Sequence, residues 1–320
     1  MKKSIIFKKT ILGAAAITLL SFSLAGCSNK SAEVPAEAAT EESAAAEEKK
    51  EVEVQADAAA ATEEKKEENS GDASSVPVDF DELLKKAEAG DAEAQYRLGA
   101  FYSDGVGVEQ DYEKAVYWFT KSAEQGNANG QSSLGECYRY GVGVEQDYEK
   151  AVEWYTKAAD QGNAAGQNGL GGCYRNGEGV EQDYAKAFEY FTKAAEQGDA
   201  RAQLNLAFHY IDGNQVEQDF DKGAELVAKS AEQGYAEAEY YMGVMYYNGA
   251  GVEQDYEKAA EWIEKAAEQG NVKAQKTLGD FYLYGVGVEQ DEEKAIEWYN
   301  RAAEQGDLEA YFIVEELKKE

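Results

Sequence analysis

Residues 105–116 read Gly-Val-Gly-Val-Glu-Gln-Asp-Tyr-Glu-Lys-Ala-Val, and residues 123–126 read Ala-Glu-Gln-Gly. Copies of both stretches recur every 36 residues. A Glu-Gln-Gly triplet, or a close variant of it, ends at Gly90, Gly126, Gly162, Gly198, Gly234, Gly270 and Gly306. A fixed period of this length is typical of a solenoid, in which each unit buries its apolar face only against its neighbours. The sequence therefore predicts one elongated array rather than two globular domains.

Each period predicts two helices. The first helix follows a capping residue such as Asp91 and stops at a glycine such as Gly105. The second helix starts after an aspartate such as Asp111 and stops at the glycine of Glu-Gln-Gly. Because both connections are short, neighbouring helices must be antiparallel. The predicted fold class is all-α: residues 79–320 form a solenoid of stacked antiparallel helical hairpins, with six full repeats and a lone helix at each end.

The repeat resembles a known family. The stretch Ala-Glu-Ala-Gln-Tyr-Arg-Leu-Gly from Ala92, the loop from Gly105 and the Ala-Glu-Gln-Gly from Ala123 together resemble the Sel-one-like repeat (SLR), which is related to tetratricopeptide repeats. The resemblance covers roughly residues 80 to 318 in six full copies. It implies a right-handed α-solenoid that serves as an adaptor for protein complexes, often at bacterial envelopes. One departure is Glu109, which stands where the family's loop commonly has proline.

The N-terminal 26 residues predict a lipoprotein signal peptide. A basic region containing Lys2 and Lys3 precedes an apolar stretch, residues 11–20, which is too short for a comfortable transmembrane helix. The following Leu-Ala-Gly-Cys, residues 24–27, resembles the bacterial lipobox. That resemblance implies cleavage before Cys27, lipidation of its thiol and anchoring to the cell membrane or outer membrane, outside the cytoplasm. The alternative is an ordinary signal peptide with an incidental cysteine.

Composition adds two expectations. After Cys27, residues 28–78 consist mostly of Ala, Glu, Lys and Ser, and such a segment predicts a disordered tether because it cannot bury enough apolar surface to order itself. The chain has 63 acidic and 31 basic residues, a formal net charge of −32. That charge argues against nucleic acid as a partner, because such binding depends on Lys and Arg neutralising phosphates.

Comparison of the six copies divides the first helix into two faces. Residues equivalent to Gln95, Leu98, Gly99 and Tyr102 barely change, whereas those equivalent to positions 93, 96, 97, 100, 103 and 104 differ in nearly every copy. At about 100° per residue, the changing positions form one arc, which we call the variable face. The constant side predicts the core, and the variable face is free to specialise.

The variable face is rich in Tyr and Arg, the side chains that most often anchor interfaces. It predicts a concave groove for a protein or peptide, with candidate residues Tyr96, Arg97, Arg139, Tyr140, Arg175, Phe208, Tyr240, Tyr241, Tyr247 and Tyr284. Two alternatives stay open. The face could be a solvated surface that drifts without constraint, or its aromatic rings could stack on the sugars of cell-wall glycan or peptidoglycan.

Two further patterns concern packing. Aromatic residues at constant positions of the second helix predict contacts between units rather than with a ligand: they are Tyr112, Tyr148, Tyr184, Tyr256, Trp118, Trp154, Trp262 and Trp298. The third copy has glycine at positions 166, 169, 171 and 172 of one helix. Each glycine costs about 1 kcal/mol against alanine, so the sequence suggests a hinge there.

No catalytic constellation is evident in the sequence. The single histidine, His209, occupies the core register of Phe101. Some cysteine-rich relatives in the resembled family are described as penicillin-binding, but the Ser-x-x-Lys motif such chemistry needs is missing. Cys137 and Cys173 lie one repeat apart, on helices whose axes pack about 8–10 Å apart, which is beyond disulfide reach, and they provide no clustered metal ligands. The sequence predicts a non-catalytic binding protein without metal or cofactor.

We predict that Cys27→Ala abolishes metabolic labelling by a fatty-acid analogue and leaves an uncleaved or mislocalised precursor, because the thiol is the expected site of lipid attachment. The unmodified chain is the positive control. Labelling of the Cys27→Ala protein, together with its partitioning into detergent, would show that the lipoprotein interpretation is wrong.

Overall fold

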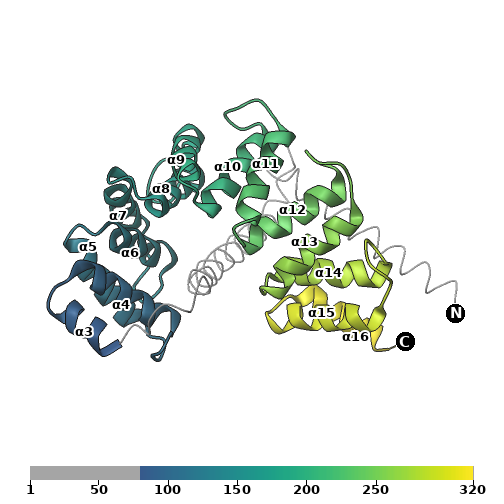
Figure 1. Cartoon of the computed structure of the whole chain (residues 1–320), viewed down its shortest axis with the longest axis horizontal. Coiled ribbons are helices and arrows are strands. Elements are labelled where there is room, and N and C mark those ends of the chain that lie inside the picture. The colour runs from purple at the N-terminus through teal and green to yellow at the C-terminus, as the bar shows by residue number, and fades with distance from the viewer. Residues whose placement is uncertain (1–79, 320) are drawn as a thin grey trace, which may run out of the picture. The chain divides into compact units, whose positions relative to one another are not determined.

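The computed structural model describes residues 80–319, and the predicted signal peptide, Cys27 and tether lie outside this range. Figure 1 shows the described chain as a series of helices joined by short turns. The helices are α3 (Phe80–Glu88), α4 (Ala92–Asp104), α5 (Tyr112–Glu124), α6 (Ala128–Tyr140), α7 (Tyr148–Asp160), α8 (Ala164–Asn176), α9 (Tyr184–Glu196), α10 (Ala200–Asp212), α11 (Phe220–Ala231), α12 (Ala236–Asn248), α13 (Tyr256–Glu268), α14 (Val272–Tyr284), α15 (Glu292–Glu304) and α16 (Leu308–Leu317). Residues 80–319 contain no strand, so the all-α prediction is confirmed.

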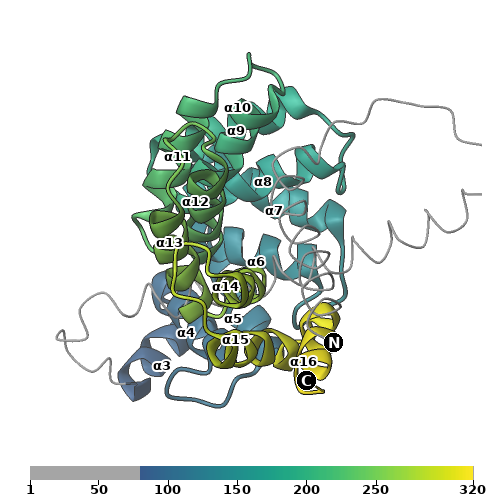
Figure 2. The same ribbon diagram turned by 90° about the vertical axis from the view of Figure 1, so that its right-hand side faces the viewer.

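The described helices fall into two compact units, divided between residues 199 and 200. The N-terminal unit consists of α3 and the hairpins α4–α5, α6–α7 and α8–α9. The C-terminal unit consists of the hairpins α10–α11, α12–α13 and α14–α15, followed by α16; Figure 2 shows its helices from another side. Each hairpin packs against the next one within its unit, and in the N-terminal unit α6 also contacts α4 and α8. This is the predicted solenoid of helical hairpins.

Helix boundaries follow from the predicted caps. The Asp91 carboxylate accepts a hydrogen bond from the backbone N–H of Ala94 (2.7 Å), and Asp111 accepts one from Lys114 (2.9 Å). Such bonds satisfy N–H groups that lack a partner within the helix. Gly105 ends α4 in the left-handed conformation, at φ 68°, and its N–H donates to the carbonyl of Phe101. One exception is α12, whose preceding residue Tyr235 makes no side-chain cap bond.

Each hairpin is closed by a small residue on one helix facing a large one on the other. A Cβ atom on Gly99 would lie 2.6 Å from the ring of Phe119, and one on Gly279 would lie 2.7 Å from the ring of Tyr299. Both rings are fully buried. In the hairpin α10–α11 the glycine instead lies on the second helix. A Cβ atom on Gly223 would lie 2.6 Å from Cγ1 of Ile211. Glycine recurs at these places because the helices approach too closely for a larger side chain.

The glutamine of each Glu-Gln-Gly triplet joins consecutive helices. The Gln125 amide donates to Gln95 (2.6 Å), and the Gln95 amide donates to the backbone carbonyl of Ala87 on the preceding helix (2.9 Å). The same bridge occurs in the C-terminal unit. The Gln305 amide donates to Gln275 (2.9 Å), and the Gln275 amide donates to the backbone carbonyl of Ala267 (3.2 Å). These side chains tie α4 to α3 and α14 to α13 through buried polar groups that are satisfied.

The four glycines of the third copy have a packing role. The helix α8 is continuous from Ala164 to Asn176. A Cβ atom on Gly169 would lie 2.4 Å from the Tyr155 ring, and one on Gly172 would lie 2.9 Å from Nη1 of Arg139. The structure thus gives these glycines a packing role in close helix contacts, and the hinge stays a prediction.

Three of the four constant tryptophans, Trp118, Trp154 and Trp262, are only partly buried, whereas Trp298 is buried. Trp154 packs against the cluster around Leu134 and Phe119, as predicted, but it remains partly exposed, and the ammonium of Lys157 lies 3.8 Å from the centre of its ring. The fully enclosed position of the second helix is the next residue along the chain, occupied by Phe119 and Phe191 and, in the last hairpin, by Tyr299.

Candidate functional site

The residues predicted for the variable face differ in exposure. Arg97 is exposed, whereas Tyr96, Tyr140, Arg175, Phe208, Tyr241 and Tyr284 are partly exposed. Arg139, Tyr240 and Tyr247 are buried, with 8%, 6% and 8% of their surface exposed. The structure therefore leaves seven of these side chains accessible to a partner and encloses three.

Arg139 is enclosed because it joins two hairpins of the N-terminal unit. Its Nε donates to the carboxylate of Glu178, in the loop after α8, at 2.7 Å. Its guanidinium carbon lies 5.1 Å from the centre of the Tyr140 ring, and Gly172 leaves room for its terminal nitrogens. A side chain held in this way stabilises the array and presents little surface to a partner, although sequence analysis grouped it with the accessible anchors.

The C-terminal unit carries an aromatic cluster on its variable face. The rings of Phe208 and Tyr241 pack edge to face with centroids 4.8 Å apart, and Tyr240 packs against Tyr241 at 5.3 Å. Tyr247 stacks on Phe281 at 5.7 Å. The buried Tyr240 supports the partly exposed Tyr241, which in turn packs against Phe208, so Phe208 and Tyr241 are the aromatic side chains best placed for contact with a partner.

Sequence analysis missed Asp280, a variable-face carboxylate on α14. The Tyr299 hydroxyl donates to its Oδ1 at 2.6 Å. Burial raises the pKa of the Asp280 carboxyl to about 6, although the Tyr299 hydrogen bond and the charge of Lys276 oppose that rise. Burial and the nearby Asp280 charge also raise the pKa of Tyr284 to about 12. Asp280 is thus a charged group kept in a poorly hydrated place.

Comparison between repeats contains the signal that would have found this carboxylate. An acid occupies this register in two repeats, as Glu136 and Asp280, and there the enclosed position of the second helix is a tyrosine, Tyr155 or Tyr299. In the repeats without the acid that position is Phe, Val or Ile. A buried phenol needs a hydrogen-bond acceptor, so the acid and the tyrosine occur together.

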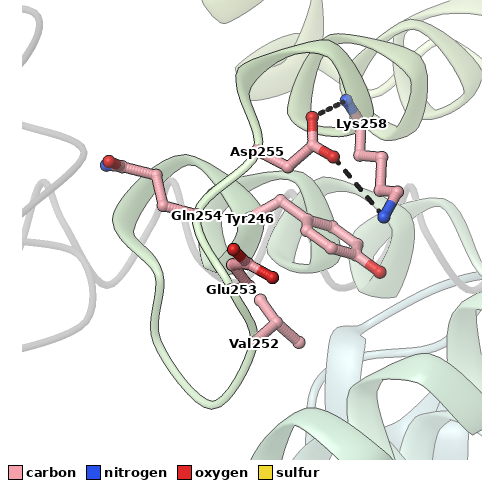
Figure 3. A pocket seen from close by; sticks show the side chains of 6 residues that line it. All are labelled: Tyr246, Val252, Glu253, Gln254, Asp255 and Lys258. Carbon is pink, nitrogen blue, oxygen red and sulfur yellow. Dashed lines mark hydrogen bonds and ion pairs between the residues drawn. The ribbon is translucent and has the colours of Figure 1, made fainter.

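A small hollow lies beside the loop between α12 and α13, with a volume of about 460 Å³ (Figure 3). The Asp255 carboxylate caps α13 by accepting from the backbone N–H of Lys258 (3.0 Å), and the Lys258 ammonium lies 5.3 Å from the centre of the Tyr246 ring. The same Tyr–Lys contact recurs in all six repeats at 4.7–5.3 Å. The hollow therefore belongs to the constant loop structure and lies apart from the variable face.

The remaining reactive residues have structural surroundings. His209 is buried, and its Nδ1 lies 3.2 Å from the carbonyl of Asn214. Cys137 and Cys173 are buried free thiols, and burial raises the pKa of Cys173 to about 11. Within residues 80–319 no three His, Cys, Asp or Glu side chains gather into a group that could hold a metal ion. In the same range, no helix has the length and apolar character needed to cross a membrane.

Comparisons with known proteins agree with this architecture. The family model described as Sel1 repeat matches residues 92–127, 128–163, 164–199, 200–235, 236–271 and 272–307. No curated protein sequence matches this chain.

Three solved structures illustrate the similarity. A Sel1 repeat protein from Oxalobacter formigenes is 30% identical, with 71% of this chain and 97% of that chain covered and a TM-score of 0.60. A protective antigen with an SLR fold from uropathogenic Escherichia coli is 38% identical, with 74% of this chain covered and a TM-score of 0.57. This chain spans about half of that antigen, 51%. An immunity protein, Pa5087, from Pseudomonas aeruginosa is 26% identical, with 67% of this chain and 81% of that chain covered and a TM-score of 0.50.

We predict that Asp280→Asn stabilises the protein at pH 7.5 by roughly 1–3 kcal/mol, at about 1.4 kcal/mol per unit of pKa shift. The folded pKa of Asp280 is raised, so its ionised form costs stability above pH 6, and the cost disappears below about pH 4. Urea unfolding at pH 7.5 and pH 4 measures the difference. Glu304→Gln, which removes an exposed charge, is the control. A loss of stability in Asp280→Asn at pH 7.5 would contradict the view that the ionised Asp280 carboxylate destabilises the folded protein.

Proposed function

This chain belongs to the Sel1 repeat family, and from that membership we propose that it is a membrane-anchored, extracytoplasmic scaffold whose variable face binds a protein or peptide partner. Sel1 repeat proteins are in general scaffolds for protein–protein interaction rather than enzymes. We extend that role to this chain and propose that it has no catalytic activity of its own.

The partly exposed pair Phe208–Tyr241 carries the proposal. Most large apolar side chains of the C-terminal unit are enclosed, whereas these two rings lie partly open on the variable face. Aromatic side chains that are rigidly supported from beneath bury a large area at little cost in conformational entropy, and for that reason they dominate the binding energy of many interfaces. In the N-terminal unit Tyr96, Arg97 and Tyr140 are candidates for the same role.

A protein partner has further support. The similarity to a protein named an immunity protein favours a protein ligand over a small molecule. The net charge of −32 favours a partner with a basic surface, because charge complementarity speeds association and suppresses binding to acidic proteins. The lipobox-like sequence ending at Cys27 supports the anchor and the extracytoplasmic location.

The test is crosslinking of a partner to the full chain in intact cells. We predict that the triple variant Tyr140→Ala, Phe208→Ala, Tyr241→Ala loses the crosslinked partner while its circular dichroism is unchanged. The matched control replaces three tyrosines of the second helices, Tyr117, Tyr184 and Tyr256, which are 54%, 42% and 45% exposed. That control should keep the partner.

Two other outcomes are informative. If the variable-face triple variant keeps the crosslinked partner but no longer sediments with purified cell wall, the glycan alternative replaces the proposal. If it keeps both activities, recognition lies outside these side chains and the proposal is wrong.

A further inference from the structure

The last described helix, α16, carries a cluster of exposed apolar side chains. Leu308, Tyr311 and Phe312 are 71%, 51% and 62% exposed, and the rings of Tyr311 and Phe312 lie with their centroids 5.6 Å apart. We call these three side chains the C-terminal patch. The other exposed large apolar side chains of residues 80–319 lie singly on four different second helices. Single exposed rings are ordinary on a protein surface, whereas a contiguous apolar patch marks an interaction site.

The lone helix α3, at the start of the array, shows what a terminal helix without such a patch looks like. Its large apolar side chains, Phe80, Leu83 and Leu84, pack against Leu98 and its neighbours. Its exposed side chains are polar: Asp81, Glu82, Lys85, Lys86 and Glu88. A polar outer face of this kind keeps the end of a solenoid soluble. The exposed apolar side chains of α16 depart from that rule and call for a partner.

The preceding hairpin shows that a helix covers the equivalent surface. Tyr311 and Glu315 lie one 36-residue period after Gln275 and Gly279 of α14. There the residue that follows α15 donates a hydrogen bond to Gln275 (2.9 Å), and a Cβ atom on Gly279 would lie 2.7 Å from the α15 ring of Tyr299. In α16 the same positions are open, because Tyr311 is exposed and the Glu315 side chain is 45% exposed. The open surface is therefore the one that receives a helix in the hairpin before it.

Glu315 argues against a further repeat of the same solenoid as the occupant. Five of the six repeats have glycine at this position, and the remaining one has Ala207. Because even a Cβ atom on Gly279 would lie 2.7 Å from the facing ring, the longer Glu315 side chain prevents an equally close approach. The second-type helix α3 of another copy is also a poor match, since its exposed side chains are polar. The occupant is a helix with a different sequence.

Charge indicates which kind of helix fits. Residues 304–319 carry five acidic and two basic side chains. The two basic residues, Lys318 and Lys319, already pair with Glu315 (4.0 Å) and Glu316 (2.9 Å). The surroundings of the patch are therefore acidic, which favours a basic partner. The same charge disfavours an anionic lipid surface, and the net charge of −32 disfavours a second copy of this chain.

We propose that the C-terminal patch binds a basic amphipathic α-helix of a protein partner, with the apolar stripe of that helix on Leu308, Tyr311 and Phe312 and a basic side chain facing Glu315. Amphipathic helices bind apolar surfaces through side chains spaced three and four residues apart. Phe312 lies in the register of Tyr96, so the patch adjoins the variable face. The inference rests on the function proposed above in taking a protein as the partner, and it adds the kind of segment that binds.

The probe is a fluorescent peptide of about 14 residues, or four helical turns, made of Leu and Lys in amphipathic order. It is titrated into the full chain and followed by fluorescence anisotropy. A peptide of the same composition in scrambled order has the same charge without the apolar stripe, and it should bind at least about fivefold more weakly. The variant Tyr311→Ser, Phe312→Ser should bind the ordered peptide roughly tenfold more weakly, because aromatic anchors carry much of the binding energy.

The matched control is Phe220→Ser, Tyr256→Ser, which also removes one Phe and one Tyr. These side chains are 37% and 45% exposed on α11 and α13 of the same unit, and their loss should leave the affinity unchanged. Glu315→Lys should weaken the Leu–Lys peptide and strengthen a Leu–Glu peptide of the same pattern. Equal affinity of the wild type and the patch variant, or equal binding of the scrambled peptide, would overturn this inference.

Two further measurements separate the other occupants. Sedimentation in which the wild type self-associates and the patch variant does not would assign the patch to a second copy of this chain. Flotation with phosphatidylcholine vesicles that is lost in the patch variant would assign it to lipid. Either result would overturn the inference. Because the probe is a purified peptide, this test can fail while the crosslinking test of the variable face succeeds, and the reverse also holds.

Discussion

The array depends on a close approach of two helices within each hairpin. A glycine on one helix leaves room for a ring or branched side chain of the other, as Gly99 does for Phe119 and Gly171 for Phe191. Each such contact excludes water from a large apolar surface, which is the main source of favourable free energy in folding. Because a repeat buries this surface only within itself and against its neighbours, the same contact must be made again in every copy.

The glutamine bridges set how one hairpin meets the next. Gln95 receives a hydrogen bond from Gln125 and donates to a carbonyl of the preceding helix, so a buried polar network joins three helices. In residues 236–271 a glutamate, Glu239, replaces the accepting glutamine, and Gln269 still donates to it at 2.6 Å. The constant face is thereby fully occupied by packing and hydrogen bonds. Apart from buried side chains such as Arg139, Tyr240 and Tyr247, the variable face takes little part in this packing, which allows each repeat to present different side chains to a partner.

Local patterns in the sequence were sufficient to predict the helices and hairpins, because caps such as Asp111 and terminal glycines such as Gly105 act within a few residues. The accessibility of the candidate site was harder to predict. Helical register placed Arg139 on the variable face, but its burial depends on Glu178, which lies in a loop one repeat away and stands where three of the other copies have valine. The environment of Asp280 likewise depends on Tyr299, from a different helix. Periodicity identifies which face a residue lies on, whereas exposure depends on the neighbours that cover it.

The central claim is that the constant face holds the array together while the variable face is free for binding. The most direct measurement is the urea unfolding midpoint of Phe191→Ala compared with that of Tyr140→Ala. Phe191 is fully enclosed beside Gly171, so its truncation should cost about 3–5 kcal/mol, as large-to-small core changes do. Tyr140 is partly exposed, and its loss should cost less than about 1 kcal/mol. Equal midpoints for the two variants, or a larger loss for Tyr140→Ala, would contradict this division of roles.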